Sequence, residues 1–355
     1  MNISVTKTAT PKEKPTGPLG FCKYYTDHMF LMNYSTEKGW YNPRIEPYAP
    51  IALSPATTVF HYGQAIFEGM KCYKGQNGEI RFFRPFDNFK RMDNSADRIC
   101  MPRLDVETAM EGLKQLVKLD ESWIPTEKGT SLYIRPTMIG TDPYLGVKAS
   151  DTYLFYIILS PVGSYYSKGL NPVNIYVEDF YSRTAPVGGT GAAKFGGNYG
   201  CSLKASYEAK KKGYDQVLWL DGAQRKYIEE VGSMNICFVI GGKVVTPELD
   251  GSILPGITRN SIVNLARTLG YEVEERMITI DELVEAAKNG QLTEMFGTGT
   301  AAVVSPVGMF SYKGHEYKVG DGGIGKTTQK LYDTLVGIQN GLIEDTHNWV
   351  YVMEK

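Results

Sequence analysis

Short apolar runs alternate with glycine in the first third of the chain. Val59–Phe60, Lys71–Tyr73 and Ile80–Phe83 are rich in β-branched and aromatic residues. Runs of this kind, bounded by turn-forming residues, are typical of antiparallel hairpins. We therefore predict short strands at these three places, punctuated by Gly63, Gly69, Gly75 and Gly78.

Apolar residues at helical spacing follow. Phe86–Ile99 and Val106–Leu119 each place apolar side chains three or four positions apart, which predicts two amphipathic helices. Ser131–Pro136 and Thr152–Leu159 then read as two further strands. The first half of the chain is therefore expected to have a mixed α+β organisation.

A loop-like segment near the middle of the chain marks the expected domain boundary. Ser160–Pro172 holds two prolines, two glycines and the pair Tyr165 and Tyr166. At about 150 residues per domain, a chain of 355 residues predicts two domains. We expect a smaller N-terminal domain at 1–162, an interdomain loop at 163–175 and a larger domain at 176–355.

The second half alternates strands and helices more regularly. Glycine follows each predicted helix, as is usual at helix C-termini, and Thr279 with Glu282 has the spacing of a capping box. The predicted strands are Val173–Val177, Gln216–Leu220, Ile236–Ile240 and Val244–Thr246, and the predicted helices are Cys201–Lys212, Thr258–Leu269 and Asp281–Lys288.

Composition excludes several classes of protein. The 38 basic and 39 acidic residues give a net charge of −1, which argues against a broad nucleic-acid or membrane-surface footprint. With 42% hydrophobic and 22% charged residues, the chain has the composition of a globular protein. No apolar stretch approaches the roughly 18 residues of a membrane-spanning helix.

Cysteine and histidine usage points to a reducing compartment without a zinc site. The five cysteines are scattered and form no CxxC pair, and the four histidines show no metal-ligand spacing. The N-terminal stretch before Pro18 lacks the apolar region of a secretory signal. We therefore expect a cytoplasmic protein with no metal.

Many of the 38 glycines lie in a few glycine-rich segments, and two of these segments are similar to nucleotide-binding motifs. Gly297–Ala302 matches GxGxxA, but a β-branched stretch with Pro306 follows it where a Rossmann site needs a helix. Gly191–Gly196 has Walker spacing, but Lys194 lies inside the loop and no Lys-Ser/Thr pair follows it. Neither motif therefore predicts a nucleotide site, although Thr298 and Thr300 suit an anion nest.

A third candidate is the turn Leu254–Asn260, which opens directly into a predicted helix. Backbone N–H groups at a helix start, together with the Thr258 hydroxyl, form a natural anion site. A plain N-cap by Thr258 is the simpler interpretation of the same residues.

The most informative stretch is Gly188–Gly200, which holds one lysine, Lys194, among small and apolar residues. A lysine amine becomes a useful nucleophile toward aldehydes when its surroundings lower the cost of the neutral form. Phe195, Tyr199 and the absence of other charges in the stretch favour such a role over a solvated loop lysine.

This glycine-rich stretch and its companions resemble the branched-chain amino-acid aminotransferases, which are pyridoxal-phosphate enzymes of fold type IV. The resemblance covers about Phe21 to Tyr351. In the second half it rests on Gly188–Gly200, Tyr227–Asn235, Leu254–Thr258 and Phe296–Thr300. In the first half it rests on Thr26–Met29, Tyr62–Lys71, Phe83–Pro85, Arg91–Met92 and Ser131–Pro136.

The resemblance implies a two-domain α/β (mixed α+β) fold with a β-barrel-like core in the larger domain. It implies that Lys194 holds pyridoxal 5′-phosphate as a Schiff base and then moves the proton of the reaction. Glu230 would face the pyridine nitrogen, with Glu229 as the plausible misassignment, and Tyr199 would bind the phenolic oxygen. The phosphate would be held by Arg91, Ile257, Thr258 and Thr300.

The resemblance also implies the substrate pocket and the partners. Branched-chain amino acids and 2-oxoglutarate would share one slot, in which Arg135 or tyrosine hydroxyls receive the γ-carboxylate. The loop from Asp142 to Leu145 would reach the partner's site in a homodimer. The residues implied for the substrate are Tyr62, Phe67, Tyr133, Arg135, Leu145, Thr300 and Ala301.

One motif departs from the family pattern. Mammalian members carry a CxxC pair after the GxGT turn, whereas this chain has Ala302 and Ser305 there. We therefore predict no thiol switch at that place.

Three alternatives stay open at this point. Within the same fold, a D-amino-acid transaminase or an aminodeoxychorismate lyase shares the glycine-rich stretches. A non-catalytic binding protein could cradle a phosphate with the same loops. A dehydrogenase using Gly297–Ala302 is the least favoured because of the missing helix.

Overall fold

The computed structural model describes residues 1–163 and 170–353, and these form two compact units. The first unit comprises Met1–Ser167, Ala193–Gly197 and Ile338–Lys355. The second comprises Lys168–Ala192 and Asn198–Gly337. Tyr165 and Tyr166 lie outside the described residues, and the domain boundary at 163–175 stays a prediction.

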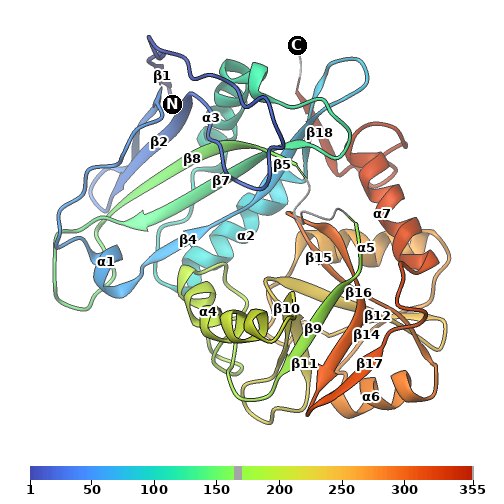
Figure 1. Cartoon of the computed structure of the whole chain (residues 1–355). Helices are drawn as coiled ribbons and strands as arrows, with labels where there is room; N and C mark the ends of the chain where they lie inside the picture. Colours follow the sequence, from blue (N-terminus) through green and yellow to red (C-terminus); the bar gives the residue numbers. More distant parts are fainter. Residues whose placement is uncertain (164–169, 354–355) are drawn as a thin grey trace. The chain divides into compact units, whose positions relative to one another are not determined.

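The first unit is built on a nine-stranded sheet with the order β1-β3-β2-β8-β7-β5-β6-β18, and β4 pairs with β7 (Figure 1). All neighbours are antiparallel except β1 and β3. The C-terminal β18 thus joins β6 from the first third of the chain. The strands are β1 Ser4–Val5, β2 His28–Ser35, β3 Gly39–Pro47, β4 Ala65–Phe67, β5 Met70–Lys74, β6 Ile80–Phe83, β7 Ser131–Gly140, β8 Thr152–Val162 and β18 Val350–Met353.

The long helices α2 (Pro85–Arg98) and α3 (Val106–Leu119) cover one face of this sheet. Because side chains alternate along a strand, every second residue of β7, such as Leu132 and Ile134, joins this core. Each large apolar side chain fully buried there contributes about 1.5–3 kcal/mol. The residues between them, such as Tyr133, point to the opposite face.

Local signals explain where the two helices begin. Pro85 occupies the first turn of α2, where a missing N–H costs nothing, and Asp87 complements the helix dipole. In α3 the Asp105 carboxylate accepts a hydrogen bond from the Thr108 N–H at 3.1 Å, which is an N-cap. Both predicted helices are confirmed to within one residue at each end.

The second unit contains a closed barrel of six strands in the order β11-β10-β9-β16-β15-β12, closed by pairing of β12 with β11. The β-barrel-like core implied by the resemblance is therefore confirmed. Strands β13, β14 and β17 extend the barrel at its edges. The strands are β9 Val173–Glu178, β10 Gln216–Leu220, β11 Ile228–Val231, β12 Met234–Ile240, β13 Lys243–Thr246, β14 Val273–Glu275, β15 Leu292–Gly299, β16 Val303–Tyr312 and β17 His315–Lys318.

Helices flank the barrel. Ala205 and Ala209 of α4 (Gly196–Lys211) pack against Val217 and Trp219 of β10. The remaining helices are α5 (Ile257–Thr268), α6 (Ile280–Lys288) and α7 (Lys326–Gln339).

The predicted helix ends of the second half are confirmed. Gly213, Gly270 and Gly290 each have positive φ, which residues with a Cβ adopt at a cost. Thr279 caps α6 by accepting the Glu282 N–H at 3.0 Å, as its spacing predicts.

Several predicted elements need correction. Val59–Phe60 belongs to a short helix, α1 (Thr58–Tyr62), and not to a strand. Two β-branched or aromatic residues are too few to form a strand when an extended Thr57 precedes them and Gly63 closes a single helical turn. Helix α4 begins at Gly196, before the predicted Cys201, and β2, β3 and α7 were not predicted.

None of the helices in the described parts of the chain combines the length and the apolar character needed to cross a bilayer.

Candidate active site

Backbone contacts within the first unit fix the position of Lys194. Its N–H donates to the Ser95 hydroxyl of α2 at 2.8 Å, and its carbonyl accepts the Phe67 N–H at 3.1 Å. A β-bridge between Ile66 and Phe195 adds a further pairing. The backbone at Lys194 and Phe195 is therefore held against β4 and α2 of the same unit.

The Lys194 amine lies over the Phe67 ring, with Nζ at 4.8 Å from the ring centroid. The side chain is half-buried. The Phe67 ring shields one side of the amine from water. This placement suits the nucleophile predicted from the sequence.

Arg91 of α2 is buried and forms a bidentate ion pair with Glu68. Nε donates to Oε1 and Nη2 donates to Oε2, each at 2.8 Å. A guanidinium has five N–H donors, so this pair is compatible with a phosphate as a second acceptor. Sequence reasoning missed Glu68, although it lies in the motif Tyr62–Lys71 that carried the resemblance.

Three of the predicted substrate residues come together on the sheet face opposite the helices. The Arg135 guanidinium lies over the Phe67 ring at 4.8 Å, and its Nη2 donates to the Tyr133 hydroxyl at 3.1 Å. The fourth, Tyr62, lies on α1, where its hydroxyl donates to the Leu145 carbonyl. Tyr62 and Leu145 are thus associated with each other, and Phe67, Tyr133 and Arg135 form a separate group.

A lysine that the sequence analysis did not assign lies beside this group. Lys71 of β5 pairs in register with Tyr133 of β7 and is only 7% exposed. Burial lowers the pKa of Lys71 to about 8, with Cys22 opposing the effect. Burial raises the pKa of the nearby Cys22 thiol, opposed by Arg135 and Lys71. The only sequence signal was that Lys71 closes the motif Tyr62–Lys71.

In the second unit, Tyr199 and Glu230 line one small cavity of about 10 Å³, together with Arg183. Glu230 is buried, its Oε1 accepts the Leu254 N–H at 2.8 Å, and Oε2 lies 3.4 Å from Nε of Arg183. A backbone N–H donor and a nearby guanidinium both favour the charged form of a carboxylate. Arg183, whose Nη2 donates to the Ser252 carbonyl at 2.5 Å, was missed because it carries no motif signal.

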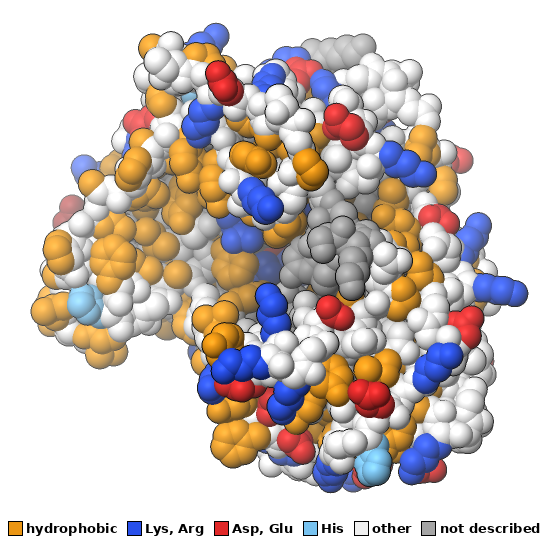
Figure 2. All heavy atoms as spheres, in the orientation of Figure 1, with side chains coloured by type: hydrophobic (Ala, Val, Ile, Leu, Met, Phe, Trp, Pro, Cys, Tyr) orange, Lys and Arg blue, Asp and Glu red, His pale blue; other side chains and the backbone are white. Residues whose placement is uncertain are grey.

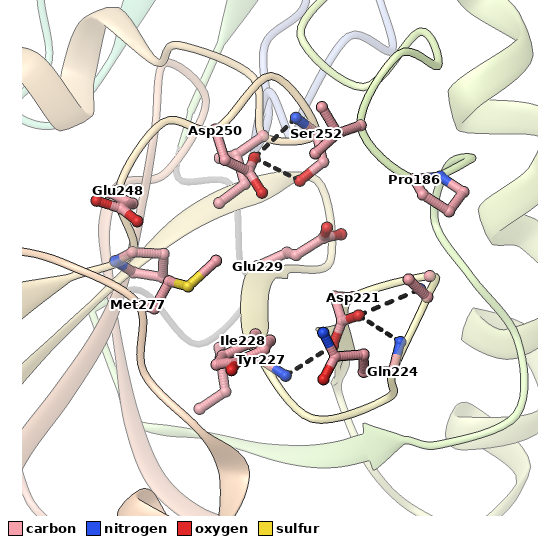
Figure 3. A pocket seen from close by; sticks show the side chains of 15 residues that line it. Pro186, Asp221, Gln224, Tyr227, Ile228, Glu229, Glu248, Asp250, Ser252 and Met277 are labelled. Carbon is pink, nitrogen blue, oxygen red and sulfur yellow. Dashed lines mark hydrogen bonds between the residues drawn. The ribbon is translucent and has the colours of Figure 1, made fainter.

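Glu229 and Glu230, neighbours on β11, point to opposite sides of the strand. Glu229 lines a different cavity of about 150 Å³ with Asp221, Asp250 and Ser252 (Figure 3). Burial raises the pKa of Glu229, opposed by the Ser252 hydroxyl and Arg183. The two carboxylates therefore have distinct environments, and only Glu230 shares a cavity with Tyr199.

The turn before α5 packs tightly on the barrel. The helix begins at Ile257 with Gly256 as N-cap, so the interpretation of Thr258 as the cap is wrong. The turn is fixed because Asn235 donates to the Leu254 carbonyl at 2.9 Å. A Cβ on Gly256 would lie 1.9 Å from the Asn235 side chain, so only glycine allows this approach. The first amides of α5, those of Ile257 and Thr258, lie directly after this turn.

The Gly297–Ala302 turn joins β15 to β16, so a strand and not a helix follows it. The context that a dinucleotide site requires is absent there, as the sequence predicts. Thr298 lies in register with Asn235, and its buried hydroxyl has no hydrogen-bond partner among the described residues. Thr300 and Ala301 occupy the turn itself.

Comparison with known families identifies a sequence profile that matches most of the chain. The family described as Amino-transferase class IV matches residues 65–309. Branched-chain-amino-acid aminotransferase 2 of Bacillus subtilis is 53% identical over 349 residues, covering 98% of this chain and 96% of that protein. Branched-chain-amino-acid transaminase 1 of the same organism is 55% identical and covers 97% of both chains.

Solved structures agree. The branched-chain amino acid aminotransferase of Escherichia coli superposes with a TM-score of 0.76 at 28% identity, covering 91% of this chain and 98% of that chain. The T.th. branched-chain amino acid aminotransferase, solved with pyridoxamine 5′-phosphate, superposes with a TM-score of 0.75 at 26% identity, covering 91% of this chain and 97% of that chain.

Proposed function

The chain belongs to the class IV aminotransferases, and we propose that it exchanges the amino group between L-leucine, L-isoleucine or L-valine and 2-oxoglutarate. The single observation that carries this substrate class is the identity of 53–55% to branched-chain enzymes over nearly the whole length. The enzyme is a transaminase and its cofactor is pyridoxal 5′-phosphate.

The chemistry of the side chains fits this cofactor. An aldehyde needs an amine, which is Lys194 beside Phe67. A phosphate dianion suits a guanidinium and the N–H groups of a helix start, which are Arg91 and the first turn of α5. A ring nitrogen that must stay protonated suits a buried carboxylate, which is Glu230.

We assign roles residue by residue. In the first unit, Lys194 binds the cofactor and Arg91 contacts its phosphate. In the second unit, Glu230 accepts a hydrogen bond from the protonated ring nitrogen and Tyr199 binds the phenolic oxygen. Ile257, Thr258 and Thr300 contact the phosphate.

When bound, pyridoxal phosphate supplies an aldehyde that captures amines and a ring that accepts electron density. Lys194 would hold the cofactor through its amine and would move the proton at the substrate Cα, because the same amine would lie beside the reacting atoms. Ser95 holds the backbone at Lys194, which limits how far the amine moves. Glu230 stabilises the proton on the ring nitrogen throughout, supported by Arg183.

Phe67, Tyr133 and Arg135 are proposed to line the substrate side-chain slot, with Tyr62, Thr300 and Ala301 completing it. An aliphatic chain contacts the Phe67 ring, while Arg135 is covered by that ring and by Tyr133. An aromatic face over the guanidinium lowers the free-energy cost of placing this charge near an apolar substrate.

We propose a homodimer in which Leu145 lines the partner's pocket. Large exposed apolar side chains lie on α1 and on the loop after β7 (Figure 2). Monomeric proteins rarely expose large apolar side chains together in one patch. Phe60 is 62%, Leu145 60% and Val147 83% exposed. Light scattering tests this state, and Leu145→Asp is expected to yield monomers with reduced turnover, whereas a monomeric unmodified protein would contradict it.

We also propose a cytoplasmic location. Cys22, Cys72, Cys100, Cys201 and Cys237 are all free thiols. Free thiols in this number are the rule in reducing compartments. Fractionation of the source cells would test this.

A substrate panel tests the proposed reaction. The purified protein with pyridoxal phosphate is incubated with 2-oxoglutarate and L-leucine, L-isoleucine, L-valine or D-alanine, and glutamate is measured. Turnover confined to D-alanine would instead favour a D-amino-acid transaminase. Borohydride reduction followed by peptide mapping is expected to place the pyridoxyl group on Lys194, and an adduct at another lysine would contradict the assignment.

A further inference from the structure

One buried cation in the first unit has no role in the reaction described so far. Lys71 lies in a cross-strand row in which it pairs with Tyr133, and Tyr133 pairs with Ser160 of β8. Side chains in register on neighbouring strands lie on the same face of a sheet. Its sequence neighbours Met70 and Cys72 instead join the helix-covered core. Lys71 therefore faces the substrate side of the sheet.

Contacts connect this row to the reactive amine. Nζ of Lys194 lies 4.8 Å from the centroid of the Phe67 ring, and the guanidinium carbon of Arg135 also lies 4.8 Å from this centroid. Arg135 donates to Tyr133, which is the partner of Lys71 in the sheet. Phe67 thus contacts both the Lys194 amine and the Arg135 guanidinium, and Arg135 leads through Tyr133 to the row that holds Lys71.

Arg135 and Lys71 act on a common neighbour. Both lower the pKa of the Cys22 thiol electrostatically, which locates both charges near the same sulfur. The buried Ser160 hydroxyl in the same row lies near the Cys22 sulfur, which is a weak hydrogen-bonding group. In the described part of the chain this hydroxyl has no nitrogen or oxygen as a hydrogen-bond partner. A buried hydroxyl of this kind is a ready donor for an incoming acceptor.

We propose that Lys71 is a specificity-determining residue that, together with Arg135, receives the distal carboxylate of glutamate and 2-oxoglutarate. This proposal rests on the proposed function, since it explains how one slot serves two kinds of substrate. At alkaline pH, Lys71 takes up a proton from solvent when the dicarboxylate binds and loses it when an aliphatic chain occupies the slot.

Arg135 and Lys71 differ in how readily they lose their charge, and this difference supports separate roles for them. A guanidinium stays charged at every accessible pH, so Arg135 depends on the covering Phe67 and Tyr133 when the substrate is apolar. A buried lysine changes its charge readily, and burial has lowered the pKa of Lys71 to about 8. Within the described part of the chain, the titratable or charged groups near Lys71 include the Cys22 thiol, Tyr133 and Arg135.

Half-reaction kinetics provide the first test. Lys71→Met, which preserves length and apolar packing, is expected to raise the KM for L-glutamate relative to that for L-leucine by roughly 10- to 100-fold, the usual effect of losing a charged hydrogen-bond partner. Lys71→Arg is expected to restore most of this ratio. The matched control is Lys74→Met on the same strand, where Lys74 pairs with Glu121 and the ratio should not change.

Calorimetry supplies a readout that does not depend on turnover. Glutarate is titrated into the holoenzyme near pH 9 in two buffers of different ionisation enthalpy, and 4-methylpentanoate is the aliphatic comparison. We expect proton uptake with glutarate only, and its loss in Lys71→Met.

Equal KM increases for both substrates in Lys71→Met, or unchanged proton uptake, would overturn the proposal and leave Lys71 a packing residue. If Lys71→Met does not fold, Lys71→Gln is measured in the same way. A protein that fails to transaminate L-leucine would refute the proposed function instead, and the glutarate titration would still report on Lys71.

Discussion

The two faces of the first unit's sheet differ in how they use the same strands. On the face covered by α2 and α3, Phe30, Leu132, Ile134 and their neighbours are fully buried in one apolar cluster. On the other face, Lys71, Tyr133 and Arg135 bring charge and hydroxyl groups together around Phe67. Because side chains alternate along each strand, a core residue and a residue of the proposed substrate slot occupy adjacent positions. Each of the following changes tests whether the two faces are separate in their effects.

The largest effect is expected at Lys194, whose side chain is the proposed nucleophile and whose backbone bonds to Ser95 and Phe67. Lys194→Ala should lower turnover by roughly 10⁴-fold or more, because both binding of the cofactor aldehyde and proton transfer are lost. The backbone contacts to Ser95 and Phe67 remain, so the melting temperature of the apoprotein should change little. Steady-state rates and calorimetric melting check this, and comparable turnover in the variant would remove Lys194 from the mechanism.

Adjacent positions on β7 give the next largest contrast. Ile134→Ala opens a cavity in a fully buried site and should reduce the free energy of unfolding by about 2–5 kcal/mol. Arg135→Gln, one residue along, should cost less stability and mainly raise the KM for L-glutamate. Denaturant unfolding and half-reaction kinetics on both variants measure the two effects. A similar stability loss in both variants would mean that the two faces are not separated.

Lys71 makes the functional face pH-dependent in its stability. Its pKa falls from 10.5 in the unfolded chain to about 8 on folding, so the unfolded state binds more protons between these values. The free energy of unfolding should therefore rise with pH across this window, by about 3 kcal/mol from this group alone. Denaturant titrations from pH 8 to 10 on the unmodified protein and Lys71→Met should show this rise only in the former; parallel curves would contradict it.

The smallest effects come from two glycines, one on each face. A Cβ on Gly112 of α3 would lie 2.3 Å from the Phe30 ring, and overpacking of this kind costs about 1–3 kcal/mol, partly offset by the helix preference of alanine. A Cβ on Gly69 would lie 2.1 Å from the Tyr133 hydroxyl. Gly112→Ala should lower the melting temperature, whereas Gly69→Ala should mainly change KM values. The reverse assignment of the two effects would refute this interpretation of the faces.

Elements with strong local signals were predictable. Val106–Leu119 carries helical periodicity together with its own capping residue, so its bounds followed from the sequence. Strands β2 and β3 were missed although they pair along most of their length. β2 is buried on both faces, with Phe30 on one and Leu31 on the other, so it shows no polar alternation that a pattern could detect.

The site divides in the same way. Lys194 stands out in the sequence because it is a single amine in a glycine-rich stretch. Glu68, Arg183 and Lys71 do not, since an ion pair between residues far apart in the chain, or the burial of a lysine, depends on which strands become neighbours.

The amino-acid sequence by itself determined the class of fold and the family and singled out Lys194 as the expected reactive lysine, because these depend on local periodicity, residue chemistry and the order of motifs. Only the tertiary structure decided that Lys71 is buried beside Tyr133 and that Glu229 and Glu230 face different cavities. Burial and electrostatic coupling arise from strand register and barrel closure, and both of these bring together residues that are distant in the chain.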